Sequence, residues 1–157
     1  MKVIYATDRE TLPVCMPSIF LAGPTVRGGS VGSGWRPTAL EILKMNEYKG
    51  AVLYPEPKGE WHYERQLAWE KASLESATVI LFWVPRSLSM PGFTTNIEWG
   101  KWYDSGKVVL GYPKGTEKMR YLDYDAKDVG APVFHELAYT CDGAVKLAKE
   151  LINAQHA

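Results

Sequence analysis

Two glutamates occupy positions from which they could act on one bound molecule. Glu98 lies in the first turn of the helix expected after the apolar segment 78–84, and Glu70 lies inside the helix expected before that segment. One carboxylate of such a pair can attack a carbon atom while the other delivers a proton to the departing group. The spacing therefore indicates nucleophilic and acid–base chemistry at the ends of a central strand.

The elements that must position these glutamates follow an alternating pattern. Short apolar runs alternate with longer segments of helical period, which favours an α/β fold with a doubly wound, mainly parallel sheet of about five strands and helices on both faces, similar to flavodoxin or Rossmann folds. We expect strands at 18–22, 51–54, 78–84 and 107–112, an edge strand at 3–5, and helices at 35–48, 61–76, from Thr94 or Thr95 to about 105, and at 141–154. The polar segment 113–131 is expected to be irregular.

Composition narrows the possible partners. The 157 residues fit a single domain over 1–157, and 18 basic residues balance 18 acidic ones. This balance argues against duplex nucleic acid or a membrane surface as the partner and favours a small molecule. Cys15 and Cys141 lie far apart with no histidine cluster nearby, so we expect no metal site and a reduced, cytoplasmic protein. No apolar run approaches the roughly 20 residues that span a membrane.

Four segments are expected to form the ligand site. In open parallel sheets, ligands bind beyond the carboxyl ends of the strands. This rule selects 23–34, 55–59, 85–98 and the residues after 112. The first of these is rich in glycine and the third contains Glu98.

Several motifs in this order resemble a known family. They are IFLAGP at 19–24, the acidic residue Glu70 ahead of a strand, GFTTNIEWG at 92–100 and GKVVLG at 106–111. Over residues 18–113 the chain is similar to nucleoside 2-deoxyribosyltransferases and the related nucleoside-monophosphate N-glycosidases.

The resemblance implies a function and its catalytic residues. It implies cleavage of the N-glycosidic bond of a 2′-deoxynucleoside or its 5′-monophosphate, with transfer to another base or to water. Glu98, in an ExG setting, would be the nucleophile, and Glu70 would be the acid where the family usually has aspartate. The family also often has an aspartate about six residues before the nucleophile, whereas this chain has Gly92. No cofactor is implied, the partners are a nucleoside or nucleotide and a free base, and a homo-oligomer, dimer or higher, is expected.

Further residues are candidates for binding the substrate. Arg27 and Gly28 resemble the RGG of the monophosphate-cleaving branch and could hold a phosphate. Thr94, Thr95 and Asn96 are placed to hold sugar hydroxyls. The remaining candidates are Gly23, Pro24 and Gly92 in the loops, Glu56 for the base, Gln66 to orient Glu70, and Trp69 and Trp83 as an apolar wall.

Each assignment has an alternative. Thr95 and Glu98 also fit a capping box, in which Glu98 only closes its own helix. Glu70 fits a solvated helix charge paired with Lys71, and the tryptophans fit core or interface anchors. At the level of function, the alternatives are a non-catalytic nucleotide-binding or sensing module on the same scaffold and, more remotely, a flavodoxin-like carrier of flavin.

Overall fold

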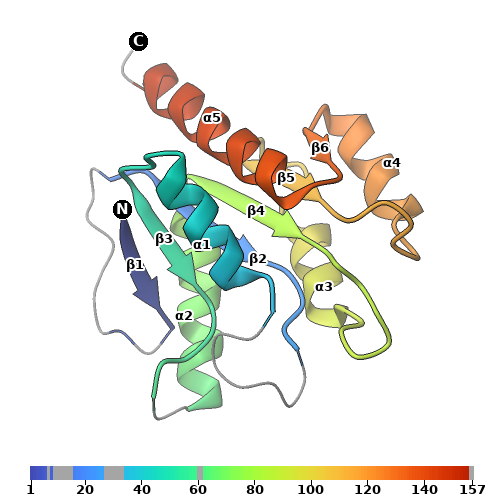
Figure 1. Ribbon diagram of the computed structural model, residues 1–157, viewed down its shortest axis with the longest axis horizontal. Coiled ribbons are helices and arrows are strands. Elements are labelled where there is room, and N and C mark those ends of the chain that lie inside the picture. Colours follow the sequence, from blue (N-terminus) through green and yellow to red (C-terminus); the bar gives the residue numbers. More distant parts are fainter. Residues whose placement is uncertain (7, 9–15, 27–33, 60–61, 156–157) are drawn as a thin grey trace.

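The protein forms one parallel sheet with helices on both faces (Figure 1). The computed structural model describes residues 1–6, 8, 16–26, 34–59 and 62–155. The strands are β1 (Lys2–Tyr5), β2 (Ser18–Ala22), β3 (Ala51–Tyr54), β4 (Val79–Trp83), β5 (Val108–Gly111) and β6 (Val133–Phe134). The helices are α1 (Arg36–Met45), α2 (Tyr63–Ser76), α3 (Phe93–Trp102), α4 (Arg120–Val129) and α5 (Leu137–Gln155). The predicted α/β fold class is confirmed, although the sheet has six strands rather than about five.

The strand order places a crevice at a defined point. The sheet runs β1-β3-β2-β4-β5-β6, and every neighbouring pair is parallel. Without β1 this is the flavodoxin order, in which the winding direction reverses between the first and third strands. Here these strands are β2 and β4, so the loops after them diverge and leave space for a ligand.

Two apolar cores hold the layers together. Alternate residues of β4 point to opposite faces, with Ile80 and Phe82 in one core and Leu81 and Trp83 in the other. The first core packs under α2, α3 and α4, and the second under α1 and α5. Because both faces are covered, all five residues of β4 are buried, as its continuous apolar sequence predicts.

Several predicted boundaries are wrong. Segment 113–131, which was predicted to be irregular, contains α4, a helix that is polar on average but has Leu122 and Ala126 buried on one stripe at helical spacing. The two-residue strand β6 was not expected, and α5 begins at Leu137 rather than 141. The edge strand β1 is present as expected.

Helix α3 also begins differently from the prediction. Its N-cap is Gly92, whose φ of 70° lies in the left-handed region, and no side chain caps the helix. Glu98 therefore lies in the second turn of α3 rather than the first. Among the described residues, no helix is long and apolar enough to cross a membrane.

Candidate active site

A cavity of about 830 Å³ opens beyond the carboxyl ends of β2, β3 and β4. Its walls come from the loops after these strands and from the facing sides of α2 and α3. The predicted site residues that line it are Gly23, Pro24, Glu56, Gln66, Glu70, Gly92, Thr94, Thr95 and Glu98. Three of the four segments expected to hold the ligand thus meet at this one cavity, at the point where the winding of the sheet reverses.

Glycine at position 23 allows the floor of the cavity to form. A Cβ atom at Gly23 would overlap the main-chain carbonyl of Trp83 and crowd the ring of Trp35. Gly23 also has a φ of 153°. Glycine therefore lets the chain leaving β2 pass directly against the end of β4.

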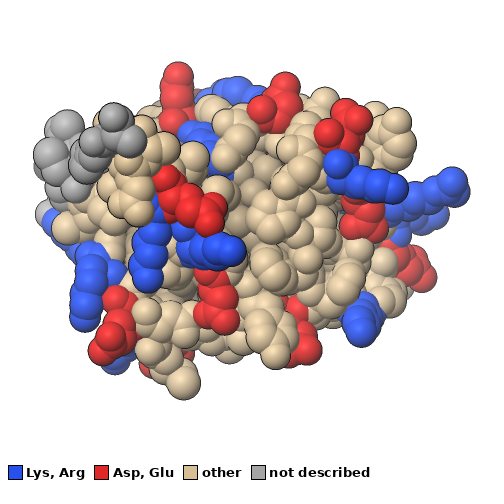
Figure 2. All heavy atoms as spheres, turned by 90° about the horizontal axis from the view of Figure 1, so that it is seen from above, with Lys and Arg blue, Asp and Glu red and all other residues tan. Residues whose placement is uncertain are grey.

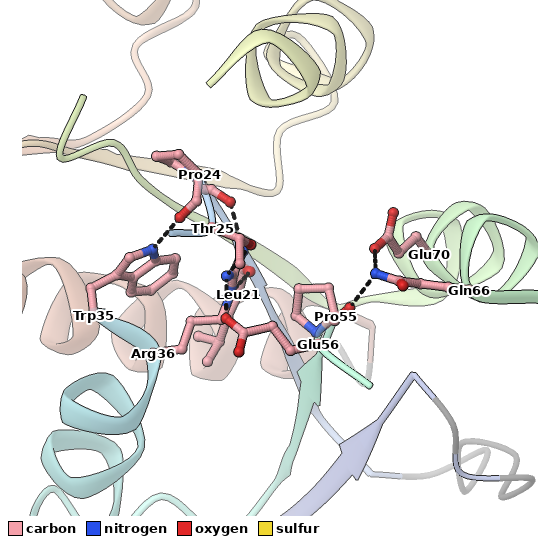
Figure 3. A network of polar contacts seen from close by, with 10 residues as sticks. Leu21, Pro24, Thr25, Trp35, Arg36, Pro55, Glu56, Gln66 and Glu70 are labelled. Atoms are coloured by element: carbon pink, nitrogen blue, oxygen red, sulfur yellow. Dashed lines mark hydrogen bonds and ion pairs between the residues drawn. The ribbon is translucent and has the colours of Figure 1, made fainter. Parts of the chain in front are cut away.

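Helix α2 presents one face to the cavity. Tyr63, Gln66, Leu67 and Glu70 all line it, and their spacing of three, four and seven residues places them along one side of a helix. Gln66 Nε2 donates to Glu70 Oε1 at 2.8 Å and to the carbonyl oxygen of Pro55 at 2.8 Å (Figure 3). Gln66 thus ties the Glu70 carboxyl to the loop after β3, the orientation expected from its position one turn before Glu70.

Glu98 enters the cavity from the opposite helix. Because α3 has no side-chain cap, the capping-box interpretation of Thr95 and Glu98 is wrong. Thr94 and Thr95 lie one turn before Glu98 and line the cavity with it. The two carboxylates of the predicted catalytic pair therefore belong to separate helices that face one hollow.

The environment of the two glutamates raises the pKa of both. Burial, and to a lesser extent the negative charge of Glu70, raise the pKa of Glu98 to about 7, while the charge of Arg36 acts in the opposite direction. Burial also raises the pKa of Glu70, against the lowering effects of the Gln66 hydrogen bond and of Arg36. Two carboxylates in one poorly solvated site resist ionising together, so near neutral pH the pair holds one proton.

The third carboxylate of the cavity is already paired. Glu56 Oε1 accepts a bond from Arg36 Nη1 at 2.8 Å, and both side chains are buried. Arg36 was not predicted to belong to the site. Its only sequence signal is its place at the start of the helix after the glycine-rich loop, beside Trp35.

Three predicted substrate contacts lie outside the cavity lining. Trp69 packs on Phe20, with ring centroids 6.2 Å apart, and Trp83 is buried in the core on the other face of the sheet. Asn96 Oδ1 accepts a bond from Arg86 Nη2 at 2.6 Å. The expected phosphate-binding residues Arg27 and Gly28 lie outside the described residues.

Two exposed aromatic residues at the cavity were not predicted. Tyr63 is 63% exposed and Phe93 is 67% exposed, although both line the cavity. Each is the first residue of its helix, one on α2 and the other on α3. Both residues could have been identified from the sequence, because each begins a helix that follows a predicted ligand-binding loop.

The distribution of charge on the surface does not suggest a large anionic partner. On the face shown in Figure 2, basic and acidic side chains are interspersed rather than gathered by sign. Among the described residues, no group of three or more histidine, cysteine, aspartate or glutamate side chains is arranged to hold a metal ion.

Comparison with known proteins gives the family. The sequence model of the family described as nucleoside 2-deoxyribosyltransferase like matches residues 16–116, more than half of the chain. The solution structure of BlsM is similar in fold, with a TM-score of 0.60 and 18% sequence identity over 90% of this chain and 95% of that one. No curated protein matches the chain in sequence.

Proposed function

Since this chain belongs to the nucleoside 2-deoxyribosyltransferase-like family, we propose that it cleaves the N-glycosidic bond of a 2′-deoxynucleoside or its 5′-monophosphate. The deoxyribose would pass to another base or to water. One observation carries this proposal: Glu98 and Glu70 line the same cavity from opposite helices, and burial raises the pKa of both.

The reaction has two steps at the anomeric carbon. In the first, a carboxylate oxygen of Glu98 forms a bond to C1′ as the bond from C1′ to the base nitrogen breaks, and Glu70 gives its proton to the departing base. In the second, water or an incoming base attacks C1′ and releases Glu98, while Glu70 takes up the proton of the attacking group. Each step inverts C1′, so the product retains the configuration of the substrate.

One proton must be distributed correctly between the two carboxylates. The reaction needs an ionised Glu98 and a protonated Glu70, whereas in the free site burial favours a proton on Glu98. A base nitrogen that faces Glu70 would hold the shared proton there. The kcat/KM of the enzyme should therefore fall as the pH rises above about 7, where the pair loses its last proton.

The rest of the cavity suits a nucleoside. Thr94 and Thr95, one turn before Glu98, would hold sugar hydroxyls, and the carboxylate of Glu56 would contact the base. Tyr63 and Phe93 present exposed rings on which a base can stack. With a 5′-monophosphate, Arg27 and Gly28 would hold the phosphate.

We also propose that residues 1–157 act as one domain in a homo-oligomer in the cytoplasm. Leu88 is fully exposed, and Ile97 exposes an apolar side chain on α3 outside the cavity lining. Large apolar side chains left exposed to solvent can pack against a second subunit. Light scattering with size-exclusion chromatography gives the mass of the assembly, and a monomer at all concentrations would contradict this part of the proposal.

Base exchange tests the proposed activity directly. The protein is incubated with each deoxynucleoside and a second free base, and the released base and new nucleoside are quantified by chromatography. Glu98→Ala should lower the rate by about 10⁴-fold or more, because it removes the nucleophile. Glu64→Gln is the matched control, since Glu64 is exposed on α2 and lies outside the cavity lining.

The same experiment separates the enzyme from a sensing module. A sensor would bind a deoxynucleoside in a calorimeter yet release no base with any substrate. A wild-type protein that behaves in this way contradicts the proposed activity, whereas substrate binding by Glu98→Ala without turnover agrees with it.

A further inference from the structure

Arg36 joins the ends of two strands beneath the cavity (Figure 3). It is the first residue of α1, and only 3% of it is exposed. Its nitrogens donate to Leu21 O (3.1 Å), Gly23 O (2.6 Å), Thr25 Oγ1 (2.9 Å) and Glu56 Oε1 (2.8 Å). The guanidinium therefore fixes the position of the chain leaving β2 relative to Glu56, the second residue after β3.

The shape of arginine suits this place. Its planar group directs nitrogens toward separate acceptors, which a lysine ammonium on a flexible stem does less well. The guanidinium carbon lies 4.9 Å from the ring centroid of Trp35, and Trp35 Nε1 donates to the Pro24 carbonyl at 3.1 Å. Arg36 and Trp35 together thus fix the segment from Gly23 to Thr25.

Arg36 also acts on the cavity through its charge. Of the described residues that line the cavity, Arg36 is the only one with a cationic side chain, and it shares that lining with Glu56, Glu70 and Glu98. Its charge favours ionised Glu70 and Glu98 although its direct ion pair is with Glu56. The phenol of Tyr54 is a fourth titratable group under its influence.

We propose that Arg36 is a positioning residue that sets the proton occupancy of the Glu70–Glu98 pair through its buried charge while it holds the loop from Gly23 to Thr25. Its link to catalysis rests on the proposed function, but its effect on the pair does not require turnover. The competing explanation is that Arg36 only neutralises Glu56 and anchors the loop.

Paired variants distinguish charge from structure. Arg36→Met alone would leave the buried Glu56 carboxylate without a partner, so all three variants of the comparison carry Glu56→Gln. The variants are E56Q, R36K/E56Q and R36M/E56Q. They share residue 56 and differ in whether a positive charge stays at position 36.

The direct readout is the titration of the carboxyl groups. Carbon-13 NMR of glutamate-labelled protein follows each carboxyl, and the signals of Glu98 and Glu70 are assigned by their loss in the single glutamine variants. We expect the pair to titrate about one pH unit higher in R36M/E56Q than in E56Q, because the positive charge that favours the ionised carboxylates is lost. This shift lies at the low end of the range known for one nearby opposite charge. R36K/E56Q should stay close to E56Q.

Two outcomes would overturn the inference. One is the same titration curve for R36M/E56Q and E56Q in folded proteins, and the other is a shift in R36K/E56Q as large as that in R36M/E56Q. A circular dichroism spectrum and a cooperative unfolding transition establish that each variant is folded. If R36M/E56Q does not fold, the comparison uses Arg36→Gln with Glu56→Gln, which keeps polar groups at both positions.

Activity supplies a separate test. If the proposed function holds, the alkaline limb of kcat/KM should move upward by the same amount as the titration in R36M/E56Q. A protein that shows the shifted titration but releases no base contradicts the proposed function and leaves the role of Arg36 intact. An active protein with an unmoved limb contradicts the role of Arg36 alone.

Discussion

Two groups of carboxylates line one cavity but differ in their partners. Glu56 is buried against Arg36, with an ion pair of 2.8 Å that ties β3 to the start of α1. Glu70 and Glu98 make no ion pair with any residue that the structure describes, and the negative charge of Glu70 disfavours ionisation of Glu98. The ion pair of Glu56 stabilises the fold. Glu70 and Glu98, which lack an ion pair, share a proton near neutral pH, as acid–base chemistry requires.

The largest expected effect is the loss of activity when the acid of the Glu70–Glu98 pair is removed. Glu70→Gln keeps the size of the side chain but removes the proton donor, so we expect kcat/KM to fall by about 10² to 10⁴-fold. The loss should be smaller for a nucleoside whose base leaves without protonation, such as a 7-methylated purine. Steady-state rates with both substrates check this, and an equal loss for both would contradict the role of Glu70 as acid.

The paired carboxylate should matter more for stability. Glu56→Ala leaves the Arg36 charge buried without its partner, and we expect the free energy of unfolding to fall by about 3 kcal/mol. Three other hydrogen bonds to Arg36 remain, which places this estimate at the lower end for a broken buried ion pair. Urea denaturation measures the change. If the free energy of unfolding falls by less than about 0.5 kcal/mol, Glu56 does not stabilise the fold and does not differ from Glu70 and Glu98 in this respect.

Glu98→Gln should have the opposite effect on stability. The pKa of Glu98 is raised to about 7 in the folded protein from its ordinary value near 4.5, so the folded state keeps a proton that the unfolded state loses between these pH values. The fold therefore loses stability as the pH rises from about 4.5 to about 7, and the full loss is present above pH 7. The variant should be more stable than wild type by about 2 kcal/mol at pH 8, with no gain at pH 4. Urea denaturation at both pH values tests this, and an equal gain at both would contradict the account.

The smallest effect is expected at Gln66. Gln66→Leu removes the hydrogen bond that lowers the pKa of Glu70, so this pKa should rise further above its ordinary value. Carbon-13 NMR titration of the Glu70 carboxyl measures the shift. Gln66 also bonds the Pro55 carbonyl, and Glu64→Gln on the outer side of the same helix serves as the control. A fall in the pKa would contradict the assigned hydrogen-bond effect.

Much of the framework could be predicted because strong local patterns specify it. The buried strands β2, β3, β4 and β5 are continuous apolar runs, and their predicted bounds differ from the observed ones by at most a residue. Helix α4 was missed because its segment is polar on average, which favoured an irregular loop. Its apolar residues nevertheless recur at helical spacing, with Leu122 and Ala126 buried, and this periodicity is the signal that could have identified the helix.

The site was predictable in its parts but not in its contacts. Loops at the strand ends and the positions of Glu70 and Glu98 indicated the residues that the cavity brings together. The sequence does not reveal that Trp83 points to the opposite core, because the direction of each side chain depends on the register of the strand. Arg36 was missed because its acceptors, from Leu21 to Glu56, are distant in sequence and meet only after folding.

The central claim is that Glu98 forms a covalent bond to the sugar, and trapping tests it most directly. The protein is incubated with a nucleoside of a 2-fluoro-2-deoxy sugar, which slows release of the sugar from the enzyme, and is then digested and sequenced by mass spectrometry. We predict an added mass of one fluorinated sugar on the peptide that contains Glu98, with none on Glu70. Release of the base without an adduct, or an adduct on any other residue, would contradict the account.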